Sequence, residues 1–344
     1  MRIKKIFIVA NSRSGTTMLG RILGNHNEIF TFHEIHFFEQ LIADSQLNVP
    51  VSYANGIKIF SNLISIQRKG YLNHRENNLF ENESKNQLSI LYNKLNNNVT
   101  PMDIYDYYLH YECARNGKNI PCEQTPRNLF YLNEIVEKFP DAFIINMIRD
   151  PRSVMLSQKN KWKRRTLGAN NIPLFESLRS WANYHPITIS NLWKSSINNG
   201  KSHYNNKSIK LIFFEDLIKY PNKTIDKIIE FLKIKNQSKL SEIPQIGSSQ
   251  LKDNPKQKGI RKEIVSSWKN GGLTNEEIYI CQSINYKLLY EFNYKIEEIN
   301  VSYIRLVLIC FIFPIKILLS LILNLHRYKN IYSAIKRRFY DRAN

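Results

Sequence analysis

Short apolar runs, polar loops and helix-like segments follow one another along the first part of this chain. Residues 6–10 are uniformly apolar and mostly β-branched, a pattern that predicts a buried strand. A polar loop at 11–17 follows, and the apolar residues after it share one face of a predicted helix (Met18, Leu19, Ile22 and Leu23). A strand, a tight loop and a helix in this order offer backbone N–H groups to an anion at the positive helix end.

A second unit of the same kind begins at residue 142. Residues 142–148 predict another buried strand, and Asp150 and Pro151 suit the N-cap and the first turn of a following helix. Ser157 would then lie about two helical turns along that helix. Together the two units predict an α/β domain.

The region between these units is mostly helical in pattern. Residues 31–36 predict a short strand with a polar exit, and residues 37–120 predict helices separated by Asn-rich loops at 73–78 and 96–98. Aromatic residues are dense in this region and near 181–193. Their helical spacing favours packing in the core over stacking on a ligand (Tyr105, Tyr107, Tyr108, Tyr111, Trp181, Tyr184 and Trp193).

The C-terminal segment differs in kind from the rest of the chain. Residues 301–325 are mainly apolar, but Arg305, Lys316 and the helix-breaking Pro314 interrupt them. This pattern favours a pair of interfacial helices on an anionic membrane over a packed terminal helix or a spanning helix. We expect a main domain over 1–298 and an apolar and basic helical extension over 299–344, with basic residues after the apolar part (Arg327, Lys329, Lys336, Arg337, Arg338 and Arg342).

The composition favours an anionic partner. The chain has 344 residues, enough for one large α/β domain with appendages, and a formal net charge of +20. Such a charge attracts a polyanionic cofactor, an acidic acceptor or a membrane surface, and the chain has no dedicated nucleic-acid-binding module. The basic run at 159–165 follows the second unit, where it would either bind the cofactor or acceptor or form a solvated helix face.

The cysteines and the N-terminus indicate the compartment. The widely spaced cysteines form no Cys-x-x-Cys pair, which argues against a zinc site and a disulfide framework (Cys113, Cys122, Cys281 and Cys310). The apolar run at 6–10 is shorter than the core of a signal peptide. We therefore expect a cytoplasmic protein without a metal, in peripheral contact with the inner face of the membrane.

The loop at 11–17 has the chemistry of an anion cradle. Gly15 lacks a Cβ, so the backbone can approach an anion closely. Thr16 and Thr17 add hydroxyl donors, and Arg13 adds a permanent planar cation. The Gly-Lys-Ser/Thr ending of the nucleotide P-loop is missing here.

The segment Ser12–Thr17 resembles the 5′-phosphosulfate loop of sulfotransferases that use 3′-phosphoadenosine 5′-phosphosulfate (PAPS). In that family an Arg at a strand end and a Ser eight residues later hold the 3′-phosphate, and Arg149 and Ser157 match this spacing. Further segments resemble the family in the expected order (Cys122–Asn128, Phe213–Leu217 and Ser267–Glu277). The resemblance is to the tyrosylprotein and carbohydrate branch of the family.

This resemblance implies both a fold and a donor site. The fold would be a P-loop-like three-layer α/β domain, in which helices flank a central, mostly parallel sheet, followed by the C-terminal helical extension. The 5′-phosphosulfate would be held by the first loop, without a metal (Arg13, Ser14, Gly15, Thr16 and Thr17).

Glu34 is the expected general base. In the tyrosylprotein and related sulfotransferases, a Glu at this distance from the loop Arg takes the proton of the attacking hydroxyl, which is typically worth ~10²–10⁴ in rate. His33 and His36 flank Glu34 as surface residues or as neighbours of the site. Arg13 would stabilise the charge that develops on the leaving phosphate.

One position departs from the family pattern. The family has Lys in a Glu-Lys-Thr-Pro segment where this chain has Gln124, so Gln124 could hydrogen-bond the sulfonate or Arg127 could supply the charge. The resemblance implies transfer of a sulfonate from PAPS to a hydroxyl or amine of a carbohydrate, glycan or other metabolite. The alternatives are a P-loop kinase-like phosphotransferase and a catalytically weak adenine-nucleotide-binding protein at a membrane surface.

Overall fold

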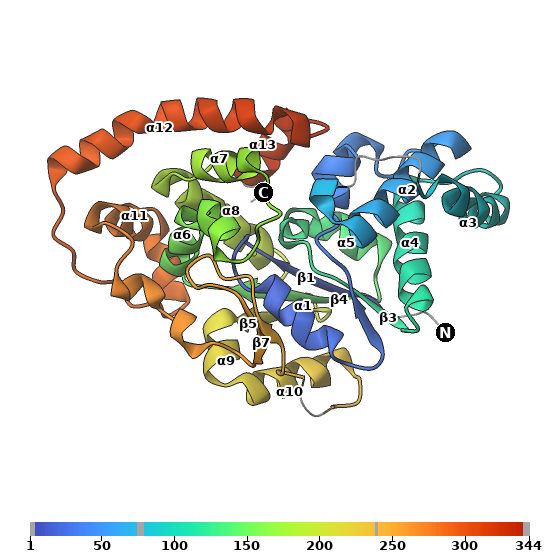
Figure 1. The fold of residues 1–344 in the computed structure, drawn as a ribbon, viewed down its shortest axis with the longest axis horizontal. Coiled ribbons are helices and arrows are strands. Elements are labelled where there is room, and N and C mark those ends of the chain that lie inside the picture. The colour runs from blue at the N-terminus through green and yellow to red at the C-terminus, as the bar shows by residue number, and fades with distance from the viewer. Residues whose placement is uncertain (1–3, 74–78, 238–239, 340–344) are drawn as a thin grey trace.

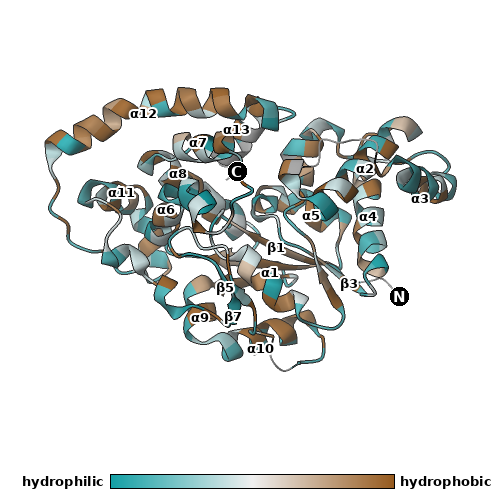
Figure 2. Ribbon diagram, in the orientation of Figure 1, coloured by the Kyte–Doolittle hydropathy of each residue, from teal (hydrophilic) through white to brown (hydrophobic). Residues whose placement is uncertain are grey.

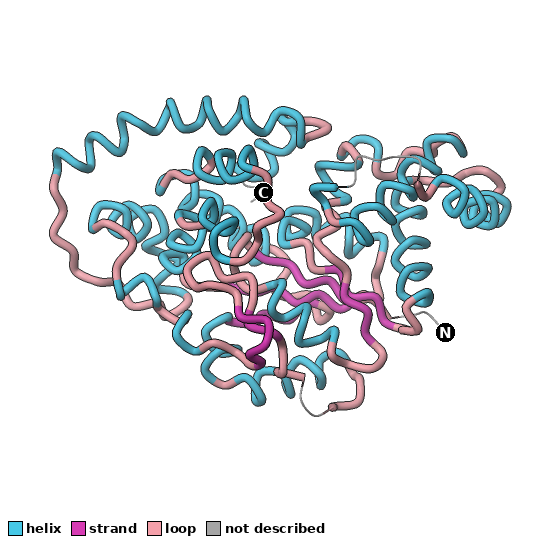
Figure 3. The backbone as a smooth tube through the Cα atoms, in the orientation of Figure 1, coloured by secondary structure: helices cyan, strands magenta, loops and turns pink. Residues whose placement is uncertain are grey.

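A five-stranded parallel sheet forms the centre of this computed structural model, which describes residues 4–73, 79–237 and 240–339. The strand order is β2–β3–β1–β4–β5, and helices cover both faces (Figures 1 and 3). The expected three-layer α/β fold is therefore confirmed. The strands are β1 (Ile6–Ala10), β2 (Ile29–Thr31), β3 (Ile120–Glu123), β4 (Phe143–Ile148) and β5 (Ile209–Phe213), with a small antiparallel hairpin of β6 (Pro244–Gln245) and β7 (Asn254–Lys258) beside them.

Side chains of the central strands alternate between two cores. In β1, Phe7 and Val9 pack into one cluster, whereas Ile6, Ile8 and Ala10 pack into the other. The first cluster includes residues of α2, α4 and α5, and the second includes residues of α1, α9 and α10. The helices are α1 (Thr16–Gly24), α2 (Tyr53–Lys69), α3 (Glu81–Lys94), α4 (Pro101–Arg115), α5 (Leu132–Lys138), α6 (Pro151–Lys159), α7 (Leu174–Ala182), α8 (Pro186–Lys201), α9 (Phe214–Lys219), α10 (Pro221–Leu232), α11 (Asn275–Glu291), α12 (Tyr303–Asn324) and α13 (Ile331–Phe339).

The pairing of β1 with β4 decides where a ligand can bind. These strands run in register from Ile6 opposite Phe143 to Ala10 opposite Met147, so their carboxyl ends meet at one edge of the sheet. The chain passes from β1 to β2 on one side and crosses to β4 on the other. Parallel sheets bind ligands at such a reversal, outside the carboxyl ends of the strands.

Local sequence signals explain the start of α6. The Asp150 carboxylate accepts a hydrogen bond from the Arg152 backbone N–H (2.8 Å), and Pro151 occupies the first turn, as predicted. The predicted loop at 96–98 is also present, with positive φ at Asn96 and Asn97. Of the loop predicted at 73–78, residues 74–78 lie outside the described residues.

Other predictions about single elements were wrong. The strand expected at 31–36 ends at Thr31, because its pairing with β3 stops there and the backbone beyond it bonds to side chains. Trp181, which was expected in the core, is 47% exposed, although Tyr105, Tyr108 and Trp193 are buried as predicted.

The C-terminal segment also differs from the expectation. α12 is one helix that continues through Pro314, where a pair of helices was expected, because a proline removes a single intrahelical hydrogen bond and the helix can resume beyond it. Among the described residues it lies in the one helical stretch long and apolar enough to cross a membrane, by length and composition (Tyr303–Arg327, with a mean hydropathy of 2.8 over an 18-residue window).

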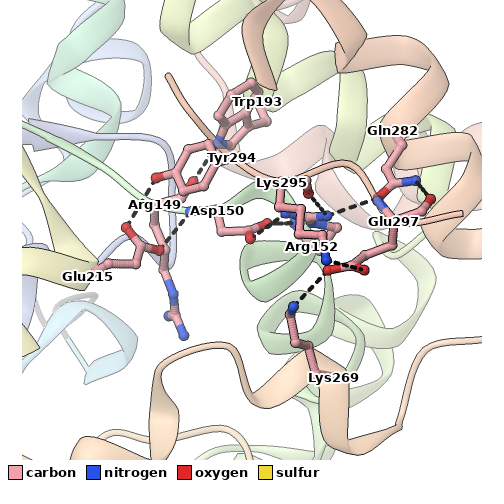
Figure 4. A network of polar contacts seen from close by, with 10 residues as sticks. All are labelled: Arg149, Asp150, Arg152, Trp193, Glu215, Lys269, Gln282, Tyr294, Lys295 and Glu297. Carbon is pink, nitrogen blue, oxygen red and sulfur yellow. Dashed lines mark hydrogen bonds and ion pairs between the residues drawn. The ribbon is translucent and has the colours of Figure 1, made fainter. Parts of the chain in front are cut away.

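A buried ion pair ties α6 to the end of the domain (Figure 4). Arg152 is 2% exposed, and its Nε and Nη2 donate to the Asp150 carboxylate at 2.9 and 2.8 Å. Its Nη1 donates to Gln282 Oε1 and the Lys295 carbonyl, and the guanidinium lies 4.1 Å from the centre of the Trp268 ring. A buried guanidinium without its carboxylate would be strongly unfavourable.

We therefore predict that Asp150→Asn lowers the free energy of unfolding by about 3–5 kcal/mol, because the Arg152 charge loses its partner. Lys269→Met is the control, since Lys269 pairs with Glu297 at the surface in the same network and its loss should cost less than about 1 kcal/mol. Urea unfolding measures both variants. Equal effects would contradict the assigned role of the buried pair.

Candidate active site

A cavity of about 340 Å³ lies at the carboxyl ends of β1 and β4. Its walls combine the loop after β1, the start of α1, the end of β4, α6, and residues 243–250 and 259–264. The cavity brings together nearly all the predicted site residues, which are far apart in sequence (Arg13, Gly15, Thr16, Thr17, Glu34, Arg149 and Ser157). Ser14 alone among the predicted residues is absent from the lining, and its side chain is buried.

Gly15 shapes the floor of the cavity. Its φ of 97° lies in the left-handed region, and an added Cβ would fall 2.4 Å from Phe214 Cδ2. Gly15 is also the N-cap of α1, and no described side chain caps that end of the helix. The first N–H groups of α1 are therefore free to bind an anion.

The Arg13 side chain connects the two predicted anion positions. Its Nε donates to Ser157 Oγ (3.0 Å) and its Nη2 donates to the Gly247 carbonyl (3.1 Å). Ser157 Oγ also lies 2.8 Å from Ser249 Oγ, and the Ser249 hydroxyl donates to the Ser157 carbonyl. Ser249 lines the cavity but was missed from the sequence, because only the tertiary contact with Ser157 distinguishes it from other serines.

Arg149 is held at both its backbone and its side chain. Trp193 Nε1 donates to the Arg149 carbonyl (2.8 Å; Figure 4). The guanidinium donates to the Arg13 carbonyl (2.9 Å) and lies 4.1 Å from the centre of the Phe214 ring. Glu215 Oε1 accepts a hydrogen bond from the backbone N–H of Asp150, the residue after Arg149. Burial, opposed by the Glu215 carboxylate, lowers the pKa of Arg149 to about 10. Its Nε is buried and has no hydrogen-bond partner among the described residues.

The lining is strongly cationic. Glu34 is the one carboxylate among its described residues, against six basic side chains (Arg13, Arg21, Arg149, Lys161, Arg164 and Arg261). Burial, followed by the nearby Arg13 and Arg179 charges, lowers the pKa of Lys161 to about 7. Lys161 belongs to the basic run at 159–165, so the structure places one member of that run against the site.

The segment that carries Glu34 is fixed from the end of β3. Thr125 Oγ1 accepts from the backbone N–H groups of Ile35 (3.0 Å) and His36, and its hydroxyl donates to Glu123. Glu123 is buried, and burial raises its pKa to about 7. The carboxylate of Glu34 is thus positioned by residues that never touch the cavity.

The two histidines beside Glu34 have different surroundings. His33 is exposed, and its backbone N–H donates to Gln67 Oε1. His36 Nε2 lies 3.5 Å from Glu34 Oε2, and burial together with surrounding arginines lowers the pKa of His36 to about 3. A neutral His36 ring can therefore present an N–H to the Glu34 carboxylate.

Neither residue considered as a replacement for the family Lys lines the cavity. Gln124 is buried, and its Nε2 donates to the Phe32 carbonyl (2.9 Å), where it supports the Glu34 segment. Arg127 instead donates to the Tyr328 hydroxyl (2.9 Å) in the C-terminal part of the chain. Lys161 is the ammonium group that reaches the cavity.

Comparison with known proteins identifies the family of this chain. A model described as "Sulfotransferase family" matches residues 5–238, which is more than half of the sequence. The chain belongs to the sulfotransferase family. It is accordingly a sulfotransferase. No curated protein is similar enough to match.

Solved structures show the same fold. The sulfotransferase domain from the curacin biosynthetic pathway is 20% identical, with a TM-score of 0.50 over 86% of this chain and 100% of that chain. The sulfotransferase domain of the Synechococcus PCC 7002 olefin synthase is 18% identical, with a TM-score of 0.50 over 86% and 96%. The mouse sulfotransferase SULT7A1, solved with 3′-phosphoadenosine 5′-phosphate (PAP), is 14% identical, with a TM-score of 0.40 over 84% of this chain and 86% of that chain.

We predict that Gly15→Ala lowers the free energy of unfolding by about 1–3 kcal/mol more than Gly117→Ala does. Both glycines have positive φ, but the space beside Gly117 is open, whereas a Cβ at Gly15 meets the Phe214 ring. The difference therefore isolates the close approach of Phe214 from backbone strain. Urea unfolding of the two variants checks this prediction. Equal losses in the free energy of unfolding would show that the Phe214 ring moves aside at no cost.

Proposed function

We propose that this sulfotransferase uses PAPS as its donor and transfers the sulfonate to a hydroxyl of a carbohydrate or another polyol, with Glu34 as general base. The observation that carries the proposal is the single cavity that gathers Arg13, Thr16, Arg149, Ser157 and Glu34. Five of its basic residues are arginines, and guanidinium groups suit phosphate oxygens. PAPS is a cytoplasmic metabolite, so we also propose a cytoplasmic location.

The residues present fit an adenosine bisphosphate. The uncapped start of α1 and the Cβ-free Gly15 form a cradle for one phosphate. The unpartnered Nε of Arg149 and the Ser157 hydroxyl suit a second phosphate. PAPS supplies the sulfonate when it is bound, and it leaves as 3′-phosphoadenosine 5′-phosphate (PAP).

Glu34 is proposed to hold the acceptor hydroxyl and take its proton. Its carboxylate lines the cavity and is partly exposed, so an acceptor can reach it. His36 would orient this carboxylate through its N–H. Arg13, in the loop after β1, would stabilise the charge that develops on the phosphate oxygen as the bond to sulfur breaks.

Calorimetric titration of the full chain with PAP and with ATP·Mg²⁺ tests the donor. Micromolar PAP binding without comparable ATP binding supports the proposal. Preference for ATP would instead favour a phosphotransferase.

We predict separate roles for Arg149 and Glu34. Arg149→Ala should weaken PAP binding by about 2–5 kcal/mol, because a buried charge partner of a phosphate is lost. Glu34→Gln should leave PAP binding nearly unchanged and lower kcat by ~10²–10⁴, because the proton acceptor is lost. Arg115→Ala, at an arginine that is 50% exposed, controls for the change in net charge. Equal losses of PAP affinity at Arg149 and Glu34 would refute this division.

We predict that PAP affinity falls as the pH rises from neutral. A bound phosphate favours the charged form of Lys161, so its pKa rises from about 7 on binding and the complex holds more protons than the free protein. At about pH 8, binding should take up as much as about one proton. Calorimetry in buffers of different ionisation enthalpy measures the uptake, which Lys161→Met should abolish and Lys163→Met, at an exposed neighbour, should not.

A further inference from the structure

Three polar side chains of α12, Lys316, Ser320 and Asn324, bond to residues at the end of α7. Lys316 Nζ lies 3.2 Å from the centre of the Trp181 ring and donates to the Trp181 carbonyl. The Ser320 hydroxyl donates to Asn183 Oδ1 (2.7 Å), and Asn324 Nδ2 donates to the same oxygen (2.7 Å). A soluble helix would direct such groups to water and its apolar residues to the protein.

The outward faces of α12 and the adjacent α7 are apolar. In α7, Glu176 and Arg179 pair with each other on the inner side (2.7 Å). The outward residues of α7 are all at least 46% exposed (Leu174, Phe175, Leu178 and Trp181). Those of α12 are more than half exposed (Ile304, Val307, Phe311, Ile315, Leu318 and Ile322), and Figure 2 shows α12 as an apolar helix along one side of the molecule. We call these two faces, with Leu325 after α12, the apolar surface.

The orientation and charge of α12 fit a bilayer with anionic headgroups. Side-chain bonds hold the helix along its length, from His185 at the Ile309 carbonyl to Arg179 at Asn324, so α12 lies along the domain (Figure 1). Exposed Arg305 lies near its start, and the chain carries a net charge of +20. An apolar face combined with basic groups is typical of a helix that lies in the membrane interface.

A second cavity of about 990 Å³ adjoins this surface. Phe175 and Leu325, both part of the apolar surface, lie in its wall. Polar and aromatic groups also line the cavity (Gln40, Asn62, Tyr71, Glu176, Arg327 and Tyr328). Aromatic rings next to carboxylate, amide and guanidinium groups are suited to a hydroxylated, sugar-like ligand.

Two side chains, Tyr71 and His36, separate the second cavity from the proposed general base. The Tyr71 ring in its wall lies 4.9 Å, centre to centre, from the ring of His36, which contacts Glu34. Two buried polar atoms in this lining, Gln40 Oε1 and Arg327 Nε, have no hydrogen-bond partner among the described residues. An acceptor headgroup in this cavity would supply the missing partners.

We propose that the acceptor is a membrane lipid with a hydroxylated polar headgroup, such as a glycolipid, which enters the second cavity from a bilayer bound at the apolar surface. The headgroup reaches past Tyr71 and His36 into the first cavity, where its hydroxyl gives its proton to Glu34. Its oxygen bonds to sulfur as the bond from sulfur to the phosphate oxygen of PAPS breaks, so PAP leaves and the product is a lipid sulfate ester. This inference rests on the proposed function, because it assigns the acceptor of the same reaction.

The first test measures membrane binding of the full chain. The protein should float with vesicles of phosphatidylcholine and phosphatidylglycerol, and less with phosphatidylcholine alone. Phe311→Ser with Ile315→Ser should weaken this binding at least about tenfold, because two apolar side chains no longer enter the bilayer. The matched control is Ile90→Ser with Tyr290→Ser, which changes residues of similar exposure on α3 and α11. Equal binding by both double variants would overturn the proposal.

The second test measures the acceptor. With ³⁵S-labelled PAPS, label should enter the organic phase when vesicles of total lipid from the source cells are supplied. Gln40→Leu should lower the rate of this labelling about tenfold, because a headgroup hydrogen bond is lost, while PAP affinity stays unchanged. Label confined to water-soluble acceptors, or no label while PAP still binds, would overturn the lipid acceptor.

Two further outcomes separate the alternatives. Failure to bind PAP would refute the proposed function itself, whatever the result of vesicle flotation. A dimer in vesicle-free solution that Phe311→Ser with Ile315→Ser dissociates would assign the apolar surface to a second copy of this chain and overturn the proposal. Light scattering measures the molecular mass of the protein in that solution, and so shows whether it is a dimer.

Discussion

The placement of Arg13 next to Arg149 is the constraint on which the site depends. Two guanidinium groups at one edge of the sheet repel each other, and the Arg13 charge adds to the effect of burial in lowering the pKa of Arg149. The protein offsets this repulsion with carbonyl oxygens at Arg13 and Gly247, the Phe214 ring and the Glu215 carboxylate. The result is a positive site held ready for a polyanion, in which electrostatic attraction requires little rearrangement when the donor binds.

The same principle of external support applies to the proposed base. Glu34 lies in an irregular segment, yet side chains at the end of β3 and on α2 bond the backbone on both sides of it, at residues 32, 33, 35 and 36. Buried Glu123 and Thr125 link that segment to the end of β3 and so fix its position relative to the sheet. A loop residue can therefore be placed as accurately as one on a strand, while its carboxylate stays accessible to an acceptor.

Much of the fold and part of the site could be predicted from local patterns. The runs at 6–10 and 142–148 became β1 and β4, and Asp150 caps α6 as its sequence indicates. The roles considered for Gln124 and Arg127 could not be decided in this way, because their partners lie 92 and 201 residues away in the chain. The same holds for Ser249, whose importance comes from a contact with Ser157.

The sequence by itself determined the order of strands, loops and helices, the anion cradle and the apolar character of the C-terminal segment, since each depends on residues close together in the chain. Only the tertiary structure decided which cations line the cavity, how Glu34 is held, and which way α12 faces. That last point shows the physical reason clearly. Periodicity reveals that Lys316, Ser320 and Asn324 share one helix face, but only the position of α7 turns this polar face toward the domain.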